Sequence, residues 1–191
     1  MKTQVPDSLR NRFLIAMPHL MDPNFSQSVT FICEHNEQGA MGIVINRPTQ
    51  LTLGEIFRQV GIEPNSNNRY QSELIYAGGP VELERGFVLH TPGEHKWDSS
   101  ISVSPNIQLT TSKDILQAMA KNEGPENALV ALGYAGWEAG QLEREIKDNA
   151  WLTCDADPLI LFQTPMDKRL EAAAALIGVD LHLLSTEVGH A

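Results

Sequence analysis

The sequence has few cysteines and no long hydrophobic segment. Its 191 residues include only two cysteines, Cys33 and Cys154, which form neither a CxxC pair nor a cluster with histidine. We therefore predict two reduced, buried thiols and no metal site, as is typical of a cytoplasmic protein. The longest apolar run, residues 128–137, is shorter than the ~20 residues that cross a bilayer. Residues 13–17 are too few for the core of a signal peptide, so no membrane attachment is expected.

Positive charge is also scarce. The chain has 14 lysine and arginine residues against 24 aspartate and glutamate residues, which gives a formal net charge of −10. Nucleic-acid binding begins with lysine and arginine side chains that neutralise phosphates. The nearest approach to a basic cluster is Arg10 with Arg12. The charge balance therefore disfavours direct binding of DNA or RNA.

Recognised catalytic motifs are missing as well. The sequence contains no GxSxG elbow, no HExxH pair, no GxxxxGK(S/T) phosphate loop and no GxGxxG dinucleotide fingerprint. We predict no catalytic residue and no cofactor, although catalytic groups can assemble from distant segments. If the protein is an enzyme, Cys33 and Glu143 are the candidate groups. Cys33 and His35 are expected on one face of a strand, where core packing is favoured over a nucleophile–base pair.

Short apolar runs between turn residues predict most of the secondary structure. Strands are expected at residues 13–17, 28–35, 40–46, 74–77, 86–91, 101–109, 128–132 and 158–162. Helices are expected at residues 52–60, 138–148 and 168–177, and another is opened by a capping box of Thr111 with Asp114. The strands occur both as hairpins and as helix-separated units. This pattern favours an α/β (mixed α+β) fold, in which a mixed sheet closes partly into a barrel with helices outside.

Residues 132–152 form the most distinctive segment. It contains Gly133, Tyr134, Gly136, Trp137 and Gly140. Glycines beside large aromatic residues mark tight turns or close backbone approach. We expect a strand, then an elaborate turn, then the helix at 138–148 and finally another strand. On that helix, Glu143 lies beside the apolar stripe and can pair with Lys147.

Four motifs support a family resemblance. In chain order they are FLIAMPHLMDPNF at 13–25, GIVINRP at 42–48, AGGPVELERGFVLH at 77–90 and LGYAGWEAGQLEREIKDNAWL at 132–152. With these motifs the chain resembles the AlgH/YqgE family of small bacterial proteins. The resemblance implies a single domain with a bifurcated, partly barrel-like sheet flanked by helices. It implies no reaction, because the family has no established one; its "transcriptional regulator" labels descend from an effect on alginate-gene regulation in pseudomonads.

Polar residues at strand ends are the candidate ligand-binding groups, because ligands of α/β proteins commonly bind there. Arg47 could offer a bidentate fork to a carboxylate or phosphate, although pairing with an acidic side chain, such as one on the 138–148 helix, is favoured. Gly78 and Gly79 could form an anion nest, although a tight turn is favoured. His90 is better explained as a structural residue than as a base. The whole predicted set is Asn46, Arg47, Gly78, Gly79, His90, Trp137, Gln141 and Glu143.

These residues lead to a geometric expectation and three functional hypotheses. Residues 1–11 are expected to form a flexible leader to one domain over residues 1–191. If a site exists, residues 132–152 form one wall, and Arg47 with the Gly78–Gly79 turn lies opposite. The leading hypothesis is a cytoplasmic accessory or regulatory protein that binds a small molecule or an unidentified protein partner. The alternatives are a transcriptional regulator that binds DNA directly and an enzyme of unknown reaction.

Overall fold

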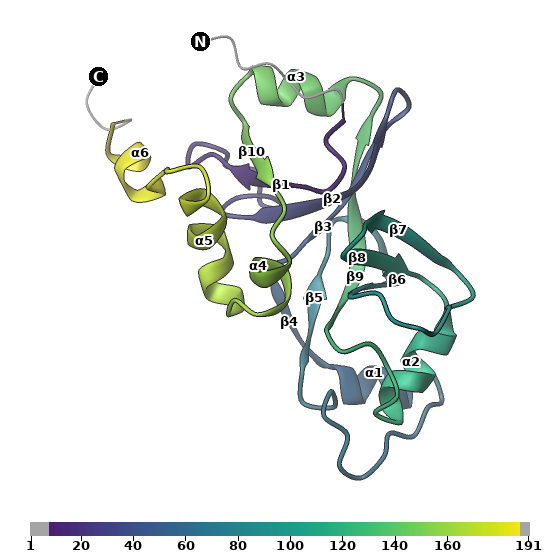
Figure 1. Ribbon diagram of the computed structural model, residues 1–191. Helices are drawn as coiled ribbons and strands as arrows, with labels where there is room; N and C mark the ends of the chain where they lie inside the picture. Colours follow the sequence, from purple (N-terminus) through teal and green to yellow (C-terminus); the bar gives the residue numbers. More distant parts are fainter. Residues whose placement is uncertain (1–7, 188–191) are drawn as a thin grey trace.

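The computed structural model, which describes residues 8–187, places ten strands in one curled sheet (Figure 1). The strands are β1 (Arg12–Ala16), β2 (Val29–Asn36), β3 (Gly39–Val44), β4 (Pro48–Thr52), β5 (Leu74–Ala77), β6 (Val81–His90), β7 (Ser100–Ser104), β8 (Ile107–Thr110), β9 (Ala128–Glu138) and β10 (Trp151–Asp155). The helices are α1 (Leu53–Gln59), α2 (Lys113–Ala120), α3 (Gln141–Lys147), α4 (Pro158–Phe162), the 3-10 helix η1 (Met166–Lys168), α5 (Arg169–Ala175) and α6 (Leu181–Glu187). The strand order is β10–β1–β2–β3–β9–β6–β8–β7, with β4 paired to β5 and β5 to β9. The predicted mixed α+β fold is confirmed.

The sheet divides at β9. Up to Leu132, β9 pairs in parallel with β5 along one edge and antiparallel with β6 along the other. From Ala135 onward, β3 replaces β5 as its neighbour. Gly78 fills the fork, because its N–H donates to the Leu132 carbonyl at 2.8 Å and its carbonyl accepts from the Val44 N–H at 2.8 Å. The sheet is therefore bifurcated, as the family resemblance implies.

Glycine is required at this fork because backbone segments lie almost in contact. A Cβ on Gly78 would lie 2.3 Å from the Gly133 carbonyl oxygen, and a Cβ on Gly79 would lie 2.1 Å from the Tyr134 carbonyl carbon. Only residues without a Cβ permit such an approach. The elaborate turn predicted after residue 132 is wrong, because β9 continues to Glu138. Gly133 serves close strand packing, whereas Gly140, with a φ of 75°, makes the turn between β9 and α3, which starts at Gln141. The predicted order of strand, turn, helix and strand is therefore kept, with a later and shorter turn.

The sheet curls until β7, the strand at one end of the strand order, contacts the segment just before β1. Arg10 lies just before β1, and its Nε donates to the Val103 carbonyl of β7 at 3.3 Å. Its Nη2 donates to the Ser102 carbonyl of the same strand. Of the expected leader, residues 1–7 lie outside the described residues, whereas Leu9 is fully buried. Residues 8–11 therefore belong to the folded body.

Three apolar clusters hold the layers together. The first includes Phe13 and Phe31 inside the curl and Leu161 of α4. The second lies between α1, α2 and the strands β5, β6 and β9. The third lies between α3 and the strands β1, β9 and β10. In Figure 1, α3 covers one end of the sheet, α1 and α2 the other, and α4 to α6 flank its side. Within residues 8–187, no helix has the length and apolar character needed to cross a bilayer.

Residues 158–162 form α4 rather than the predicted strand. A five-residue apolar run fits either structure. Here the Asp157 carboxylate accepts the Leu159 N–H at 2.9 Å, and Pro158 occupies the first turn. Both features favour the start of a helix.

Two further boundaries differ from the predictions. The segment 101–109 is a hairpin of β7 and β8 rather than one extended strand, because the chain turns at Pro105 and Asn106. The capping box of Thr111 with Asp114 is not formed. The N-cap of α2 is Ser112, whose hydroxyl donates to the Asp114 carboxylate at 2.5 Å.

Candidate functional site

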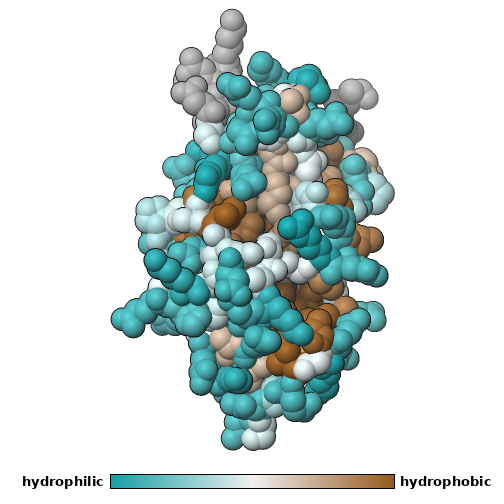
Figure 2. All heavy atoms as spheres, turned by 90° about the vertical axis from the view of Figure 1, so that its right-hand side faces the viewer, coloured by the Kyte–Doolittle hydropathy of each residue, from teal (hydrophilic) through white to brown (hydrophobic). Residues whose placement is uncertain are grey.

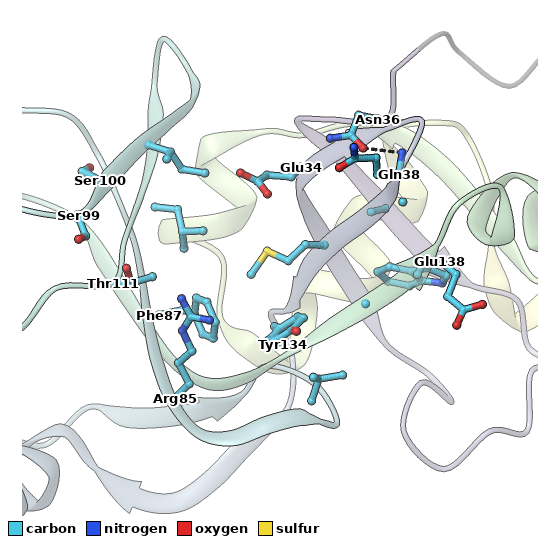
Figure 3. A pocket seen from close by; sticks show the side chains of 18 of the residues that line it. Glu34, Asn36, Gln38, Arg85, Phe87, Ser99, Ser100, Thr111, Tyr134 and Glu138 are labelled. Carbon is cyan, nitrogen blue, oxygen red and sulfur yellow. Dashed lines mark hydrogen bonds between the residues drawn. The ribbon is translucent and has the colours of Figure 1, made fainter.

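A groove of about 940 Å³ lies at the open side of the curled sheet (Figure 3). The hairpin of β2 and β3 forms one wall, and strands β6, β7 and β8 form the other. The second half of β9 crosses between them. The groove is therefore built from segments that are far apart in the sequence and that only the curl of the sheet brings together.

The floor of the groove is apolar. Its side chains include Met41, Phe87, Ile101, Leu109 and Tyr134. The rings of Phe87 and Tyr134 meet edge to face, with centroids 5.7 Å apart. The Arg85 guanidinium lies 5.3 Å from the centroid of Phe87 and pairs with the Glu82 carboxylate at 3.0 Å. Figure 2 shows that apolar side chains on the face bearing β7 and α2 lie in hollows between polar ones.

Carboxylates line the rim of the groove. Glu34 points from β2 across the groove toward the β7 side (Figure 3), and Asp98 precedes β7. Glu138 ends β9 and also borders the groove, but its carboxylate points away from it (Figure 3). Within the part of the chain that the structure describes, none of these three carboxylates forms an ion pair. The lining residues thus include three carboxylates against one cation, Arg85, which itself pairs with Glu82, so their formal charge is negative.

A β-bulge decides which residues of β2 face the groove. The pairing with β3 passes from Ile32 opposite Gly42 to Glu34 opposite Met41, so Cys33 is an extra residue. Cys33 joins the cluster inside the curl and Glu34 lines the groove, whereas His35 turns to the opposite face and meets α3. The prediction that Cys33 and His35 share a face is wrong, because strict alternation does not allow for the inserted residue.

The thiols do not provide a nucleophile. Burial, with a smaller contribution from the Glu34 carboxylate, raises the pKa of Cys33 far above its usual value. Burial also raises the pKa of Cys154 to about 11. The reactive form of cysteine is the thiolate, and both groups are protonated near neutral pH. The free, buried thiols agree with the sequence prediction.

Glu143 binds His35 rather than Lys147. The Leu9 N–H donates to His35 Nδ1 at 2.8 Å, so Nδ1 is unprotonated and the Nε2–H donates to the Glu143 carboxylate. Burial raises the pKa of the Glu143 carboxyl, but the hydrogen bond from His35 and a backbone hydrogen bond outweigh it and leave the pKa below its usual value. Both ring nitrogens are engaged, so this contact fastens α3 and the segment before β1 onto β2.

Arg47 and Asn46 hold the loop before β2. Arg47 Nη1 donates to the carbonyls of Pro23, at 2.9 Å, and Asn24, and Nη2 donates to the Ser26 carbonyl at 2.6 Å. The side-chain oxygen of Asn46, Oδ1, accepts the N–H of Val29, the first residue of β2, at 3.0 Å. The favoured pairing of Arg47 with an acidic side chain, such as one on the 138–148 helix, is therefore wrong, because backbone carbonyls accept its N–H groups instead.

The remaining strand-end candidates also make internal contacts. The Gly78 N–H already donates to Leu132 within the sheet, so it is not available to an anion. His90 is fully buried, and its Nδ1 donates to the Thr91 carbonyl at 2.9 Å while its Nε2 lies 2.7 Å from the Thr110 hydroxyl. Burial lowers the pKa of His90. These contacts support the structural interpretation of His90.

Trp137 and Gln141 lie at the junction of β9 and α3. Trp137 borders the groove and also packs in the third cluster, with its ring centroid 5.9 Å from Phe25 and 6.1 Å from Trp151. The Gln141 side chain accepts the Glu138 N–H at 3.0 Å. Gln141 thus stabilises the turn that leads into α3.

The predicted set does not converge on one cavity. Tyr134, Gly136, Trp137 and Glu138, from the 132–152 segment, line the groove. Among the predicted residues, however, only Trp137 borders the groove within the described chain. Arg47 and the Gly78–Gly79 turn do not lie opposite that wall, because the first holds the loop before β2 and the second fills the fork.

Sequence reasoning missed Glu34, Arg85 and Phe87. Glu34 lies on the polar side of an alternating strand, and nothing in the local pattern shows the bulge that turns it into the groove. Arg85 and Phe87 are two residues apart on β6, and that spacing places both on one face. A polar and an aromatic residue sharing a strand face was a signal that sequence analysis could have used.

Comparison with known proteins agrees with this fold. The AlgH-like family matches residues 13–182. A UPF0301 protein from Thioalkalivibrio sulfidiphilus is 61% identical over 181 residues, which cover 95% of this chain and 96% of that protein. The UPF0301 protein AlgH from Pseudomonas aeruginosa is 54% identical over 191 residues, which cover 100% of this chain and 100% of that protein.

Solved structures give the same result. The solution structure of the AlgH protein from Pseudomonas aeruginosa aligns with a TM-score of 0.79 at 54% identity, over 100% of both chains. A crystal structure of a protein from Corynebacterium diphtheriae shares the fold, with a TM-score of 0.75 at 18% identity over 97% of this chain and 94% of that one. Since the match of motifs, sequence and fold extends over nearly the whole chain, the protein belongs to the AlgH-like family.

Proposed function

We propose that this protein is a cytoplasmic accessory or regulatory protein that acts by binding, and that its ligand occupies the groove at the open side of the sheet. The observation that carries the proposal is the apolar floor of Met41, Phe87 and Tyr134 beneath carboxylates that lack a cationic partner in the described chain. Such a surface complements a ligand with an apolar body and a cationic group.

The size of the groove favours an extended ligand. Its volume of about 940 Å³ is near the upper end of the ~300–1,000 Å³ typical of small-molecule sites. Its walls are formed by the β2–β3 hairpin on one side and the β6–β8 strands on the other (Figure 3). We favour a basic, apolar segment of a partner protein, and a small amine with an apolar body is the alternative of the same chemistry.

The other two hypotheses lack a supporting observation. Direct DNA binding is opposed by the net charge of −10 and by the acidic rim of the groove, since both repel phosphate. An enzyme that uses Cys33 or Glu143 is opposed by the protonated, buried thiol and by the hydrogen bond that engages the carboxylate. Neither residue meets the requirements of a nucleophile or general base.

The proposal is tested first with matched small probes. Phenethylamine and hexylamine should shift amide resonances of Met41, Phe87 and Tyr134 in a saturable manner, whereas 3-phenylpropanoate and hexanoate should leave those resonances unchanged. Selection from a random peptide library should then enrich lysine and arginine beside apolar residues. A preference for acidic peptides, or equal effects of amines and acids in the groove, would contradict the proposal.

Charge variants then locate the bound ligand. Glu34→Gln should weaken the best selected peptide about threefold or more, because a rim charge that points across the groove is lost. Glu123→Gln, at an exposed carboxylate outside the groove, is the matched control and should leave affinity unchanged. If Glu123→Gln weakens binding as much as Glu34→Gln does, the attraction comes from overall charge rather than from the groove.

A further inference from the structure

A second cavity, of about 270 Å³, lies between the β5–β9 pair and the α4–α5 region. None of its lining residues belongs to the groove. Its walls are largely apolar and include Leu53, Ile75, Leu129, Leu161 and Phe162. At about 30 Å³ for each water in the liquid, the cavity has room for a ligand of roughly nine non-hydrogen atoms.

Arg169, the first residue of α5, supplies a buried cation to this cavity. Its exposure is only 6%. Nη1 donates to the Ile45 carbonyl at 2.6 Å, Nε donates to the Thr164 carbonyl at 3.1 Å, and the guanidinium lies 5.1 Å from the centroid of the Tyr76 ring. Arginine has five N–H groups, and these bonds use two of them. Nη2 forms no hydrogen bond to a residue of the described chain.

The charge of Arg169 has no carboxylate partner within residues 8–187. Arginine stays protonated at any physiological pH. A buried charge is unfavourable unless dipoles or an opposite charge compensate it. The two carbonyls accept from Nε and Nη1, whereas Nη2 has no hydrogen-bond partner in the described chain and is not shut off from the cavity, so an anion beside Nη2 would complete the site.

We propose that this cavity binds a small monocarboxylic acid with an apolar body, whose carboxylate is held by the Arg169 guanidinium. The planar guanidinium is suited to a carboxylate because it can form parallel N–H···O bonds. The apolar walls accommodate the rest of the acid. Glu73 also lines the cavity, and its carboxylate opposes additional negative charge, which selects a monoanion over a dianion.

The first test compares charge at constant shape on the unaltered full chain. Benzoate and phenylacetate should raise the melting temperature in a saturable manner and shift the amide resonances of Ile75, Leu129 and Phe162. Benzyl alcohol and benzylamine should do neither. Equal effects of acid and alcohol, or no saturable effect of either acid, would overturn the proposal.

Variants test the role of Arg169 with a matched pair. Arg169→Lys retains the charge but loses the planar fork, so carboxylate affinity should fall about tenfold or more. Glu73→Gln removes a like charge, so affinity should increase. If Arg169→Lys does not fold, Glu73→Gln still tests the proposal. Carboxylate binding by Glu73→Gln that is unchanged or weaker than in the wild type would contradict it.

The groove provides the final control. Glu34→Gln should leave carboxylate binding unchanged, because Glu34 lines only the groove. Loss of benzoate binding in Glu34→Gln would assign the acid to the groove and overturn this second site. Failure of the amine and peptide tests of the groove, in contrast, leaves the benzoate result unaffected.

Discussion

The fork of the sheet and the open groove use polar groups in opposite ways. At the fork and the adjoining β3–β4 junction, Gly78, Arg47 and Asn46 all bond to backbone within the fold. At the groove, Glu34, Asp98 and Glu138 have no ion-pair partner in the described chain. The comparison shows that the hydrogen-bonding groups of prominent residues at strand ends can all be satisfied inside the fold. Less distinctive polar residues can remain available to a ligand.

The strongest test of this comparison is Gly79→Ala. The new Cβ would lie 2.1 Å from the Tyr134 carbonyl carbon, so β9 and the chain after β5 must separate. We expect a loss of about 4 kcal/mol or more in the free energy of unfolding, measured by urea denaturation. Gly93→Ala is the control, because no atom lies within 4 Å of the position that its new Cβ would occupy, and it should change stability by less than about 1 kcal/mol. Similar losses of unfolding free energy in Gly79→Ala and Gly93→Ala would contradict the inference that the backbone is crowded at the fork.

Arg47→Met should have the next largest effect. It removes the hydrogen bonds to the carbonyls of residues 23–26, at a cost of about 1–3 kcal/mol. Phe25, in this loop, packs against Trp137 and Trp151, so tryptophan fluorescence should change as well. The exposed Arg58 of α1 provides the control variant Arg58→Met. A ligand role for Arg47 would instead leave stability and fluorescence near those of the control.

Glu143→Gln tests the contact between α3 and β2. At pH 7 we expect a loss of about 1 kcal/mol, because a charge-assisted hydrogen bond from His35 becomes a neutral one. The pKa of Glu143 in the folded protein is lower than its ordinary value of 4.5. The carboxylate therefore contributes its full stability above pH 4.5 and loses it as the pH falls through the lower folded value. Urea denaturation at several pH values should show the difference between wild type and variant shrinking in acid, and a constant difference would contradict this account.

Glu34→Gln should have the smallest effect on stability. Because Glu34 forms no ion pair within the described residues, we expect a change within about 0.5 kcal/mol by the same denaturation measurement. Binding of the amine probes, measured by NMR titration, should weaken. A large loss of stability would show that Glu34 supports the fold, as the groups at the fork do. The contrast between the two regions would then be wrong.

Much of the fold was predictable because it depends on local patterns. The apolar runs at 13–17 and 74–77 predicted β1 and β5, and the alanine-rich segment at 168–177 predicted α5. The bifurcated sheet, in contrast, was implied by the family resemblance that the motifs at 42–48, 77–90 and 132–152 carry. Residues 158–162 were predicted wrongly, because five apolar residues carry no period and the Asp157 cap decided for a helix.

The candidate site was far less predictable. The polar strand-end residues were recognised correctly as residues at junctions, but whether their hydrogen-bonding groups are satisfied depends on partners elsewhere in the chain. Arg47 is satisfied by a loop more than twenty residues earlier, and Arg169 is buried against Ile45, 124 positions away. No local pattern carries information on such partners.

The sequence alone determined the mixed α+β class, the acidic net charge and the buried state of the cysteines, since these follow from composition and short-range patterns. It determined the family through the resemblance of its motifs. Tertiary structure decided which polar groups remain available. The bulge at Cys33 turned Glu34 into the groove, the fork consumed Gly78, and the packing of α5 buried Arg169 beside a cavity. The physical reason is that hydrogen bonds and burial are settled by whichever groups the fold brings within reach, wherever they lie along the chain.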